Sequence, residues 1–470
     1  MTHRIRILAL VVGLSFAGSG ASAQTHAVSA LPSAQQRADD RSRPARQTGA
    51  EFWRALGDST LLRLVSETRQ ASPDVQIAVA RADGARAARS VAAFDMTPAI
   101  TSSAGYTRQR ISSASFPGAS GAFPDQSMWD AGLRLTWEMD VFGRLRKSLR
   151  GQGALYDAAD EDVRDVDVSL TAQVASAYLT LRGAQDRLAV ARRSAENQRR
   201  TLEVTERRLE AGRGTALDTE RAKSQLSATL AAIPTLETTI DAARQRIRVI
   251  TGRNGTDELP ALSSAIVLPD SLSLPSSASA VRDRPDVRSA ERQLAARTAF
   301  VGAARAEYLP RFSIGGAAGY TGNAVERLGN SGTPRYAIGP VISWPALDLG
   351  RVRAGVDVAR AEETQSKARY ELTRLQAREE QETAAVRYRR AKERLRHLED
   401  AATASAKAAE LARLRFVEGA SDFLPVLDAE RTLLERENER AMGRTDAETS
   451  LVAVYRAFGG ANVLGGEGAR

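Results

Sequence analysis

Apolar residues recur at every seventh position along two very long stretches of the chain, 143–211 and 350–418. In the first stretch, a row of mostly large residues faces a row of mostly small ones: Val174, Leu181, Leu188, Ala195, Leu202 and Leu209, with Leu170, Ala177, Ala184 and Ala191. Heptads that pair large with small side chains are typical of tightly packed coiled-coil helices. Each stretch would extend about 100 Å as a helix. Because both carry charge throughout, we expect them to lie in water or against other helices rather than in lipid.

Each long helical stretch ends at a glycine, after which the helical pattern resumes. The turn residues are Gly212, Arg213 and Gly214 in the first case and Gly419 and Ala420 in the second. Glycine adopts the left-handed conformation that ends a helix at little steric cost. We therefore predict two antiparallel helical hairpins, whose returning helices end near 252 and 459.

Helix-start signals follow both turns. Thr215 and Asp218 have the spacing of a capping box. Ser421 or Asp422 is the expected cap of the second returning helix, and Pro425 would fall in its first turn, where a missing N–H is tolerated. Both returning helices are thus expected to begin directly after the turns.

Strict alternation of apolar and polar residues marks shorter segments that come before each long helix. In 128–139 the apolar face holds Trp129, Ala131, Leu133, Leu135, Trp137 and Met139. In the second half of the chain the apolar face holds Tyr336, Ile338, Ile342 and Trp344. A period of two indicates β-strands. We predict two β-hairpins, at about 99–139 and 311–344, although Pro340 removes a donor from the second.

The chain repeats this order of elements once. Trp137, Gly143, Gly212 and Gly252 return at one constant offset (344 − 137 = 207) as Trp344, Gly350, Gly419 and Gly459. A constant offset over so much chain indicates a structural duplication. In each copy a helix, about 53–96 or 283–308, comes before the hairpin and ends before Pro98 or Pro310, because proline cannot continue a helix.

The start of the chain has the features of a secretory signal peptide. Arg4 and Arg6 precede an apolar run, 7–16, and Ala21-Ser22-Ala23 has the form of a cleavage site. The alternative is a short anchor helix, but the apolar run is shorter than the ~20 residues that span a bilayer. We therefore expect the chain to work outside the cytoplasm.

These signals divide the chain into six parts. They are a signal peptide, 1–23; a flexible mature N-terminus, 24–50; a first repeat, 51–252, with its helical hairpin at 143–252; a Ser/Pro-rich linker, 253–280; a second repeat, 281–459, with its helical hairpin at 350–459; and a flexible tail, 460–470. The predicted fold class is mainly α with a membrane β part, internally duplicated.

The composition of the chain excludes several classes of function and several kinds of site. The absence of cysteine excludes disulfides, cysteine nucleophiles, cysteine-ligated zinc and a lipidated N-terminal cysteine. The net charge of +9 would suit nucleic acid. However, basic and acidic residues interleave along the helices of an exported chain, so we expect no nucleic-acid partner. Because the sequence holds no nucleophile–base arrangement, phosphate loop or metal-ligand spacing, we predict neither an enzyme nor a cofactor or metal site.

Four predicted strands per chain cannot close a membrane barrel, and open sheet edges cannot lie in lipid. Two chains would supply eight strands, and side chains fill the interior of a barrel of that size. Three chains would supply twelve strands and leave a lumen, so three is the smallest number that makes a pore. The long helices would then continue the barrel as a hollow tube, with the hairpin tips around its far end.

Short motifs occur in a fixed order through both copies. They are Phe52-Trp53 before Ser72-Pro73-Asp74-Val75; Arg284-Pro285-Asp286-Val287; Ala306-x-x-Leu309-Pro310 before Gly319-Tyr320; Trp344-Pro345 before Asp348-Leu349-Gly350-Arg351; and Arg415-Phe416-x-x-Gly419 before Val426-Leu427-Asp428-Ala429-Glu430-Arg431. Each motif alone is weak, but in this order the chain resembles the trimeric outer-membrane efflux channels, the TolC/OprM/NodT family. The resemblance covers nearly all of the mature chain. It implies a 12-stranded trimeric transmembrane β-barrel joined to a periplasmic coiled-coil helical barrel.

The resemblance implies the outer-membrane channel of a tripartite efflux system. Such a channel is a passive homotrimeric duct in outer-membrane lipid. It docks to a periplasmic adaptor (membrane fusion) protein and, through the adaptor, to an inner-membrane pump. We expect a pump of the RND type here. The adaptor would contact the hairpin tips. Many relatives carry a lipid on an N-terminal cysteine, whereas this chain is expected not to be lipidated. The alternative is a periplasmic coiled-coil adaptor or scaffold protein, which the two amphipathic strand hairpins disfavour.

The resemblance also points to residues at a periplasmic gate. Asp428 matches one position of an acidic entrance ring, and Pro425 occupies the other position. Asp218 matches an aspartate that ties the closed gate to a tyrosine and an arginine, but Phe416 and Ser421 stand at those partner positions here. The gate is therefore expected to be closed differently or more weakly. The alternatives are a helix cap for Asp218 and a solvated surface charge for Asp428.

Aromatic residues stand near the ends of the predicted strands. They are Trp129, Trp137, Tyr336 and Trp344. They could be ordinary sheet-core residues, but in a membrane barrel such residues form belts at the two lipid–water interfaces. We expect the belts.

Overall fold

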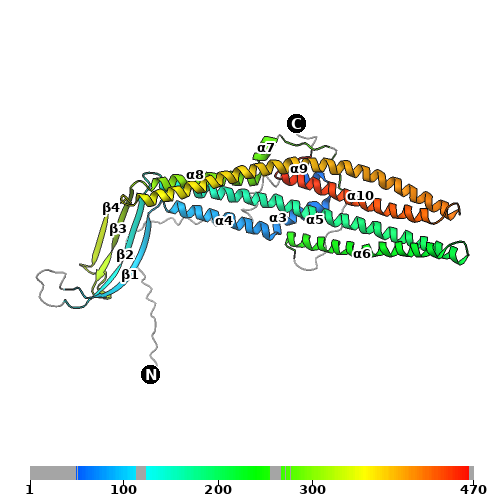
Figure 1. Cartoon of the computed structure of the whole chain (residues 1–470). Coiled ribbons are helices and arrows are strands. Elements are labelled where there is room, and N and C mark those ends of the chain that lie inside the picture. The colour runs from blue at the N-terminus through cyan, green and yellow to red at the C-terminus, as the bar shows by residue number, and fades with distance from the viewer. Residues whose placement is uncertain are drawn as a thin grey trace, which may run out of the picture.

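The computed structural model describes residues 49, 51–112, 123–253, 266–269, 271–275 and 277–464. The predicted signal peptide, nearly all of the predicted mature N-terminus and the end of the predicted tail lie outside these residues. Figure 1 shows an elongated molecule, with a four-stranded sheet at one end and two helical hairpin tips at the other. Long helices run side by side between the two ends.

Four long helices form two antiparallel hairpins. They are α5 (Arg144–Glu210) with α6 (Ala216–Thr251), and α9 (Leu349–Val417) with α10 (Leu424–Ala457). α5 packs against both α6 and α10, so the two hairpins lie against each other. α5 and α9 have 67 and 69 residues, which gives each a length of about 100 Å. Among the described residues, no helix combines the length and the apolar character needed to cross a membrane.

The predicted heptad seam of α5 is a contact surface in this bundle. Its buried members include Val174, Leu181, Leu188, Ala184 and Ala191. The seam opens toward the tip, where Leu209 is 38% exposed. Small residues let the helices approach closely, because a Cβ added at Gly183 would overlap the side chain of Thr445 on α10.

The first repeat begins with a broken helix, so the single helix expected at about 53–96 is wrong. α3 (Ser59–Ala71) and α4 (Pro73–Phe94) are separate, and Gly57, with a φ of 74°, makes an earlier break. Ser72 is extended because the residue before a proline is kept out of the helical region. The apolar pattern continues through both breaks and therefore does not reveal where the backbone changes direction.

The middle of the molecule holds several of the largest fully buried side chains. The buried aromatic residues here include Phe52, Trp53, Tyr178 and Tyr455. Asp58, which is 2% exposed, accepts a hydrogen bond from the Tyr178 hydroxyl at 2.8 Å and pairs with Arg182 at 3.1 Å. This contact fastens the start of α3 to α5, so the segment before α4 is anchored against the long helices.

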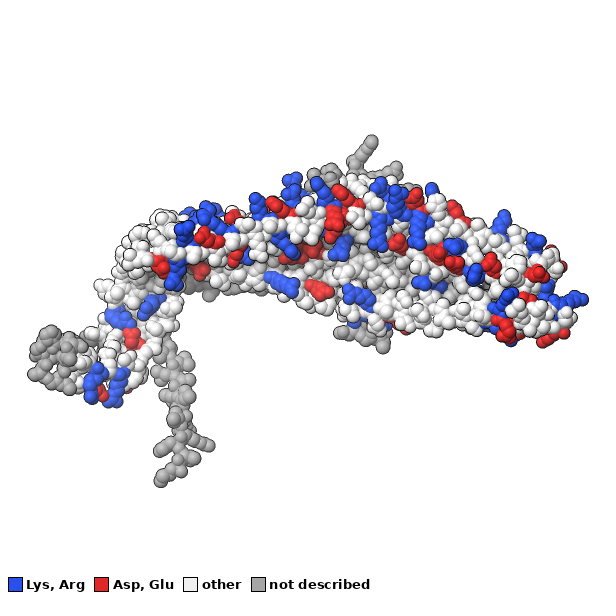
Figure 2. All heavy atoms as spheres, in the orientation of Figure 1, with Lys and Arg blue, Asp and Glu red and all other residues white. Residues whose placement is uncertain are grey.

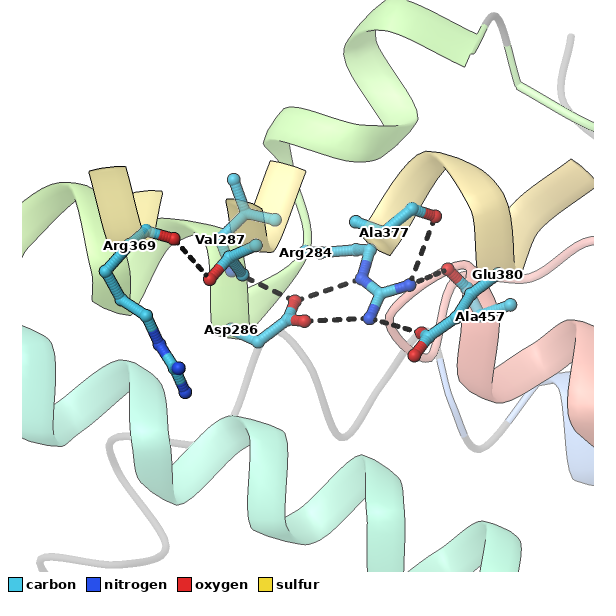
Figure 3. Close-up of polar contacts among 8 residues, drawn as sticks. Arg284, Asp286, Val287, Arg369, Ala377, Glu380 and Ala457 are labelled. Atoms are coloured by element: carbon cyan, nitrogen blue, oxygen red, sulfur yellow. Dashed lines mark hydrogen bonds and ion pairs between the residues drawn. The ribbon is translucent and has the colours of Figure 1, made fainter. Parts of the chain in front are cut away.

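Arg284 joins three helices where the second repeat begins (Figure 3). It precedes α8 (Pro285–Ala306), which follows the short α7 (Ser277–Arg282). Its guanidinium donates to both carboxylate oxygens of Asp286 at 3.0 and 2.7 Å, to Glu380 at 2.7 Å and to the carbonyl oxygen of Ala457 at 2.9 Å. Arg284 thereby ties α8 to α9 and to the C-terminal end of α10.

Asp165 on α5 faces this charged cluster. Burial and the negative charge of Asp286 raise the pKa of Asp165 from 3.8 to about 6, against the opposing charges of Arg284 and Arg456. Asp162, on the same helix, adds to the increase in pKa. The folded chain therefore binds a proton at Asp165 more tightly than the unfolded chain does.

The four strands form one antiparallel sheet in the order β1-β2-β3-β4. They are β1 (Ala99–Gln109), β2 (Gln126–Met139), β3 (Arg311–Gly322) and β4 (Pro334–Ser343), with a short helix η2 (Val325–Arg327) between β3 and β4. β2 pairs with β3, so the hairpin of one repeat is joined to the hairpin of the other. β1 and β4 are the two edges. Pro340 lies in the edge strand β4, where its missing donor is tolerated.

Candidate functional site

The two hairpin tips turn in the same way. Gly212 and Gly419 have φ values of 68° and 76°, in the left-handed region that glycine adopts readily. The backbone N–H of Arg213 donates to the carbonyl oxygen of Arg208 at 2.8 Å, and that of Ala420 donates back to the last turn of α9 at 2.8 Å. The glycine turns predicted from the sequence are present at both tips.

Thr215 caps α6 as its spacing to Asp218 predicts. The Thr215 hydroxyl oxygen accepts from the backbone N–H of Asp218 at 3.2 Å, and the hydroxyl donates to the Asp218 carboxylate at 2.7 Å. The carboxylate of Asp218 is thus engaged at the start of its own helix. In the described part of the chain it makes no hydrogen bond or ion pair with Phe416 or Ser421 of the other hairpin.

The expectation that Ser421 or Asp422 caps α10 is wrong. The helix begins after Phe423, and no side chain caps its first N–H groups. Among the described residues, Ser421 donates only to the carbonyl oxygen of Asp422, at 3.4 Å. Phe423 is buried and packs on Phe416 with ring centroids 5.6 Å apart, while Pro425 has no N–H to satisfy. Ring packing and proline therefore fix the start of α10 in place of a polar cap.

Arg208 links the two hairpins at their tips. Its guanidinium lies 4.0 Å from the centroid of the buried Phe416 ring. It also donates to the carbonyl oxygen of Phe416 and to that of Val417, the latter at 3.3 Å. A cation is favourable at this position because the carbonyls at the C-terminal end of a helix carry partial negative charge. A side chain of α5 thus caps the end of α9.

Glu430 makes a second link behind the tips. Its carboxylate is 4% exposed and accepts from Thr201 on α5 at 2.9 Å and from Arg413 on α9 at 2.7 Å. Three helices from the two hairpins therefore meet at one buried acid. Burial of a carboxylate requires such partners, because an unpaired buried charge is strongly destabilising.

Asp428 lies on the surface of α10, with a side chain that is 65% exposed. It pairs with Arg431 on the same helix at 3.1 Å. Within one chain its carboxylate has the environment of a solvated charge. The structure therefore brings Phe416 to the contact between the hairpins and leaves Asp428 in solvent.

The predicted aromatic residues of the sheet stand at two levels. Trp137 donates to the carbonyl oxygen of Met96 at 3.1 Å, and Trp344 donates to that of Tyr308 at 3.0 Å, both where the helices meet the sheet. Trp129 and Tyr336 lie in the outer parts of β2 and β4: Trp129 packs on Tyr106 with ring centroids 4.7 Å apart, and Tyr336 is 87% exposed.

The two aromatic levels have a spacing that suits a membrane. Trp129 and Trp137 are eight residues apart, and so are Tyr336 and Trp344. In extended chain this separation corresponds to about 26 Å. Strands tilted by about 40° would lower that to a height of about 20 Å, close to the apolar band of outer-membrane barrels. Figure 2 shows charged residues interleaved along the helical body and far fewer on the sheet.

Sequence reasoning missed Arg208 and Glu430, because each is one charged residue among many on a charged helix. A signal existed for Glu430, which follows the buried Val426 by four residues and so lies on the same helix face. No comparable local signal marks Arg208. Its partner Phe416 lies 208 residues further along the chain.

Comparison with known proteins identifies the family. The model of the family described as outer membrane efflux protein matches residues 64–253 and 277–460. The toluene efflux pump outer membrane protein TtgF of Pseudomonas putida is 29% identical over 422 residues, 89% of this chain and 87% of that protein. Outer membrane protein OprJ of Pseudomonas aeruginosa is 29% identical over 420 residues, 87% of this chain and 86% of that protein.

Solved structures agree with the sequence relatives. The outer-membrane channel OprN has a TM-score of 0.78 and 37% sequence identity, covering 87% of this chain and 92% of that one. The alternative of a periplasmic adaptor or scaffold protein is not favoured, because the matched family and these relatives are outer-membrane proteins. The chain therefore belongs to the outer membrane efflux protein family, and it is an efflux channel of the outer membrane.

Proposed function

We propose that three copies of this chain form one passive duct through the outer membrane. The observation that carries the proposal is the sheet, whose four strands leave β1 and β4 as open edges. Unpaired backbone groups on such edges are unfavourable in lipid, so each edge requires a strand from another copy. Three copies supply twelve strands, enough to enclose a lumen.

The helices joined to the two edge strands support the same assembly. α4 leads into β1 and carries Val91 and Phe94, which are 62% and 71% exposed. α9 follows β4 and carries Val358 and Leu375, which are 61% and 66% exposed. Large exposed apolar side chains on the helices connected to both edge strands suit burial against a neighbouring copy.

The hairpin tips are the proposed docking site for a periplasmic adaptor protein. Gly212, Arg213 and Gly214 form one tip, and Gly419 and Ala420 form the other.

An inner-membrane pump of the RND type, reached through the adaptor, is the proposed source of energy. TtgF, which is similar to this chain, is named as part of an efflux pump. The family is one of passive channels rather than enzymes.

The same tips form the proposed periplasmic gate. At the tips of this chain the hairpins are linked from Arg208 to Phe416 rather than from Asp218 to Phe416 and Ser421. We assign the closing role to the Arg208 contact because it crosses between the tips themselves, whereas the Glu430 link lies behind them. Asp428 is retained as a candidate for an acidic entrance ring, which its solvent exposure permits.

Engineered cysteines test the trimer. The chain has no cysteine of its own, so Ser103→Cys on β1 and Ala337→Cys on β4 can be combined without background disulfides. In outer membranes, a short bifunctional thiol cross-linker is expected to give covalent species up to a trimer and no larger. Each single variant is the matched control and is expected to remain monomeric on a denaturing gel. A double variant that stays monomeric, or that forms longer ladders, contradicts the proposed closure.

A further inference from the structure

The sheet has one apolar and one polar face. The β1–β2 and β2–β3 pairings place Ile100, Leu135 and Gly316 on the same face, together with Trp129 and Trp137. The other face of β2 holds Asp130, Arg134 and Glu138, which alternate with the apolar set. In a membrane barrel the apolar face is turned to lipid and the polar face to the lumen.

Arg134 lies at membrane depth. It follows Trp129 by five residues and precedes Trp137 by three, so it stands between the two aromatic levels. An arginine near the bilayer midplane costs about 2–4 kcal/mol if it faces lipid. Its place on the polar face avoids that cost. Ionisable residues at such depth usually mark a solute pathway.

The acidic residues of this face are already paired. Asp130 and Glu138 are the only acidic residues of the four strands. Asp130 pairs with Arg335, and Glu138 accepts from Arg144 at 2.8 Å. Arg134 is exposed and makes no ion pair among the residues that the structure describes. The segment 113–122, outside the described residues, contains no acidic residue that could pair with it.

The residues next to Arg134 on the polar face have small side chains or none. Thr101 and Ala317 stand directly opposite it on the neighbouring strands, and the next polar-face position, Gly132, faces Gly319. None of these side chains can cover a guanidinium or fill the space in front of it. The positive charge therefore extends further into the proposed lumen than its neighbours do.

The second repeat lacks this charge. At the constant offset of 207, Arg134 corresponds to Val341, which also stands three residues before its tryptophan, Trp344. Val341 pairs with Ser313 on the polar face and is 53% exposed. A trimer would therefore carry three such charges at one depth, one from each first repeat.

We propose that Arg134 is a selectivity residue, and that three Arg134 side chains form a ring in the barrel lumen that favours the passage of anionic solutes, those with carboxylate, sulfonate or phosphate groups. The proposal rests on the proposed trimeric duct. A ring of like charges in a narrow passage raises the local concentration of counter-ions and of solutes with the opposite charge. The ring acts on the solute and not on the pump.

Block of ion current by an anion tests the ring. Purified full-length protein is placed in planar bilayers, and sodium tripolyphosphate is added on the side of the sheet. Arg134→Gln is expected to raise the half-blocking concentration about tenfold, as the loss of three partly screened charge contacts implies. Val341→Arg is expected to lower it. Arg108→Gln removes the same charge at the opposite face and is the matched control, which should leave the block unchanged.

A chemical measurement covers the case in which no current is resolved. Ala317→Cys places a thiol opposite Arg134, and its reaction rates with a sulfonate-bearing and a trimethylammonium-bearing methanethiosulfonate are compared in outer membranes. The anionic reagent should be favoured about threefold or more, and Arg134→Gln should remove the preference. Ala318→Cys, on the lipid face, should react slowly with both reagents.

The outcomes distinguish failure of the proposed Arg134 ring from failure of the proposed trimeric duct. Equal block and equal rate ratios in Arg134→Gln and in the unmodified chain overturn the ring, even where trimers form. Slow reaction at Ala317→Cys with both reagents also overturns it, because Arg134 would then not face water. Failure of the β1–β4 cross-link in the presence of an anion preference at Ala317→Cys overturns the trimer instead.

Discussion

Replacing Arg208 should open the periplasmic end of the channel. The side chain stacks on Phe416 with its guanidinium 4.0 Å from the ring centroid, and it donates to two carbonyl oxygens at the end of α9. The stacking contributes about 0.5–1 kcal/mol at a partly exposed site. A cation at a helix C-terminus contributes about 0.3–1 kcal/mol more. With the hydrogen bonds at the low end of their range, Arg208→Ala should remove about 2 kcal/mol per chain.

A loss of about 2 kcal/mol corresponds to a change of about 30-fold in an equilibrium between linked and separated tips. We therefore expect Arg208→Ala to increase single-channel conductance, or the fraction of time spent in the high-conductance state, in planar bilayers. Arg208→Lys should give a smaller increase, because lysine keeps the charge but cannot stack and bond in the same plane.

The neighbouring Arg207 provides the control. Its side chain is 74% exposed and pairs with Glu203 on the same helix, away from the second hairpin. Arg207→Ala removes the same charge from the same turn of α5, and we expect conductance like that of the unmodified channel. If Arg207→Ala and Arg208→Ala behave alike, or if neither changes conductance, the assignment of the closing contact to Arg208 is refuted.

Three further predictions concern single residues. Asp165→Asn should raise the melting temperature at pH 8 and have little effect at pH 4. The pKa of Asp165 is raised to about 6 in the folded chain, so the stability of the unmodified chain falls as pH rises from 3.8 to about 6. This increase in pKa limits the gain in stability at pH 8 to about 3 kcal/mol, and partial exposure of the carboxylate should reduce the gain to about 1–2 kcal/mol. Equal shifts in melting temperature at both pH values would contradict the prediction. Thr215→Ala should destabilise the start of α6 by about 1 kcal/mol, measured as faster amide hydrogen exchange at 216–219, with Thr215→Ser, which keeps the capping hydroxyl, as the control. Asp428→Ala should raise conductance or weaken block by divalent cations if the residue lines an entrance ring, and unchanged conductance and block would leave it a surface charge.

Much of the fold follows from local pattern. The heptads of α5, the alternation in β2 and the glycines at the tips each specify an element through contacts within a few turns of chain. The breaks at Gly57 and Ser72 were missed because apolar spacing continues across a change of direction. The missing cap of α10 was not visible either, because the start of that helix depends on Phe423 packing across the turn on Phe416.

The candidate site was predictable only in part. The sequence placed the turns at the tips and the aromatic residues near the strand ends, because turns and strands have local signatures. It could not pair Arg208 with Phe416 or Glu430 with Thr201, since their partners are more than 200 residues away in the chain. It also could not show that Asp130 and Glu138 are neutralised while Arg134 is not.

The sequence by itself determined the kinds of element, their order and their duplication, because heptads, strand alternation and turn glycines act over short distances along the chain. Only the tertiary structure decided which charges cancel and which remain, since that depends on strand register and on helix contacts across the two repeats. Joining β2 to β3 sets one register for the whole sheet, and that register leaves Arg134 without an acidic partner among the described residues.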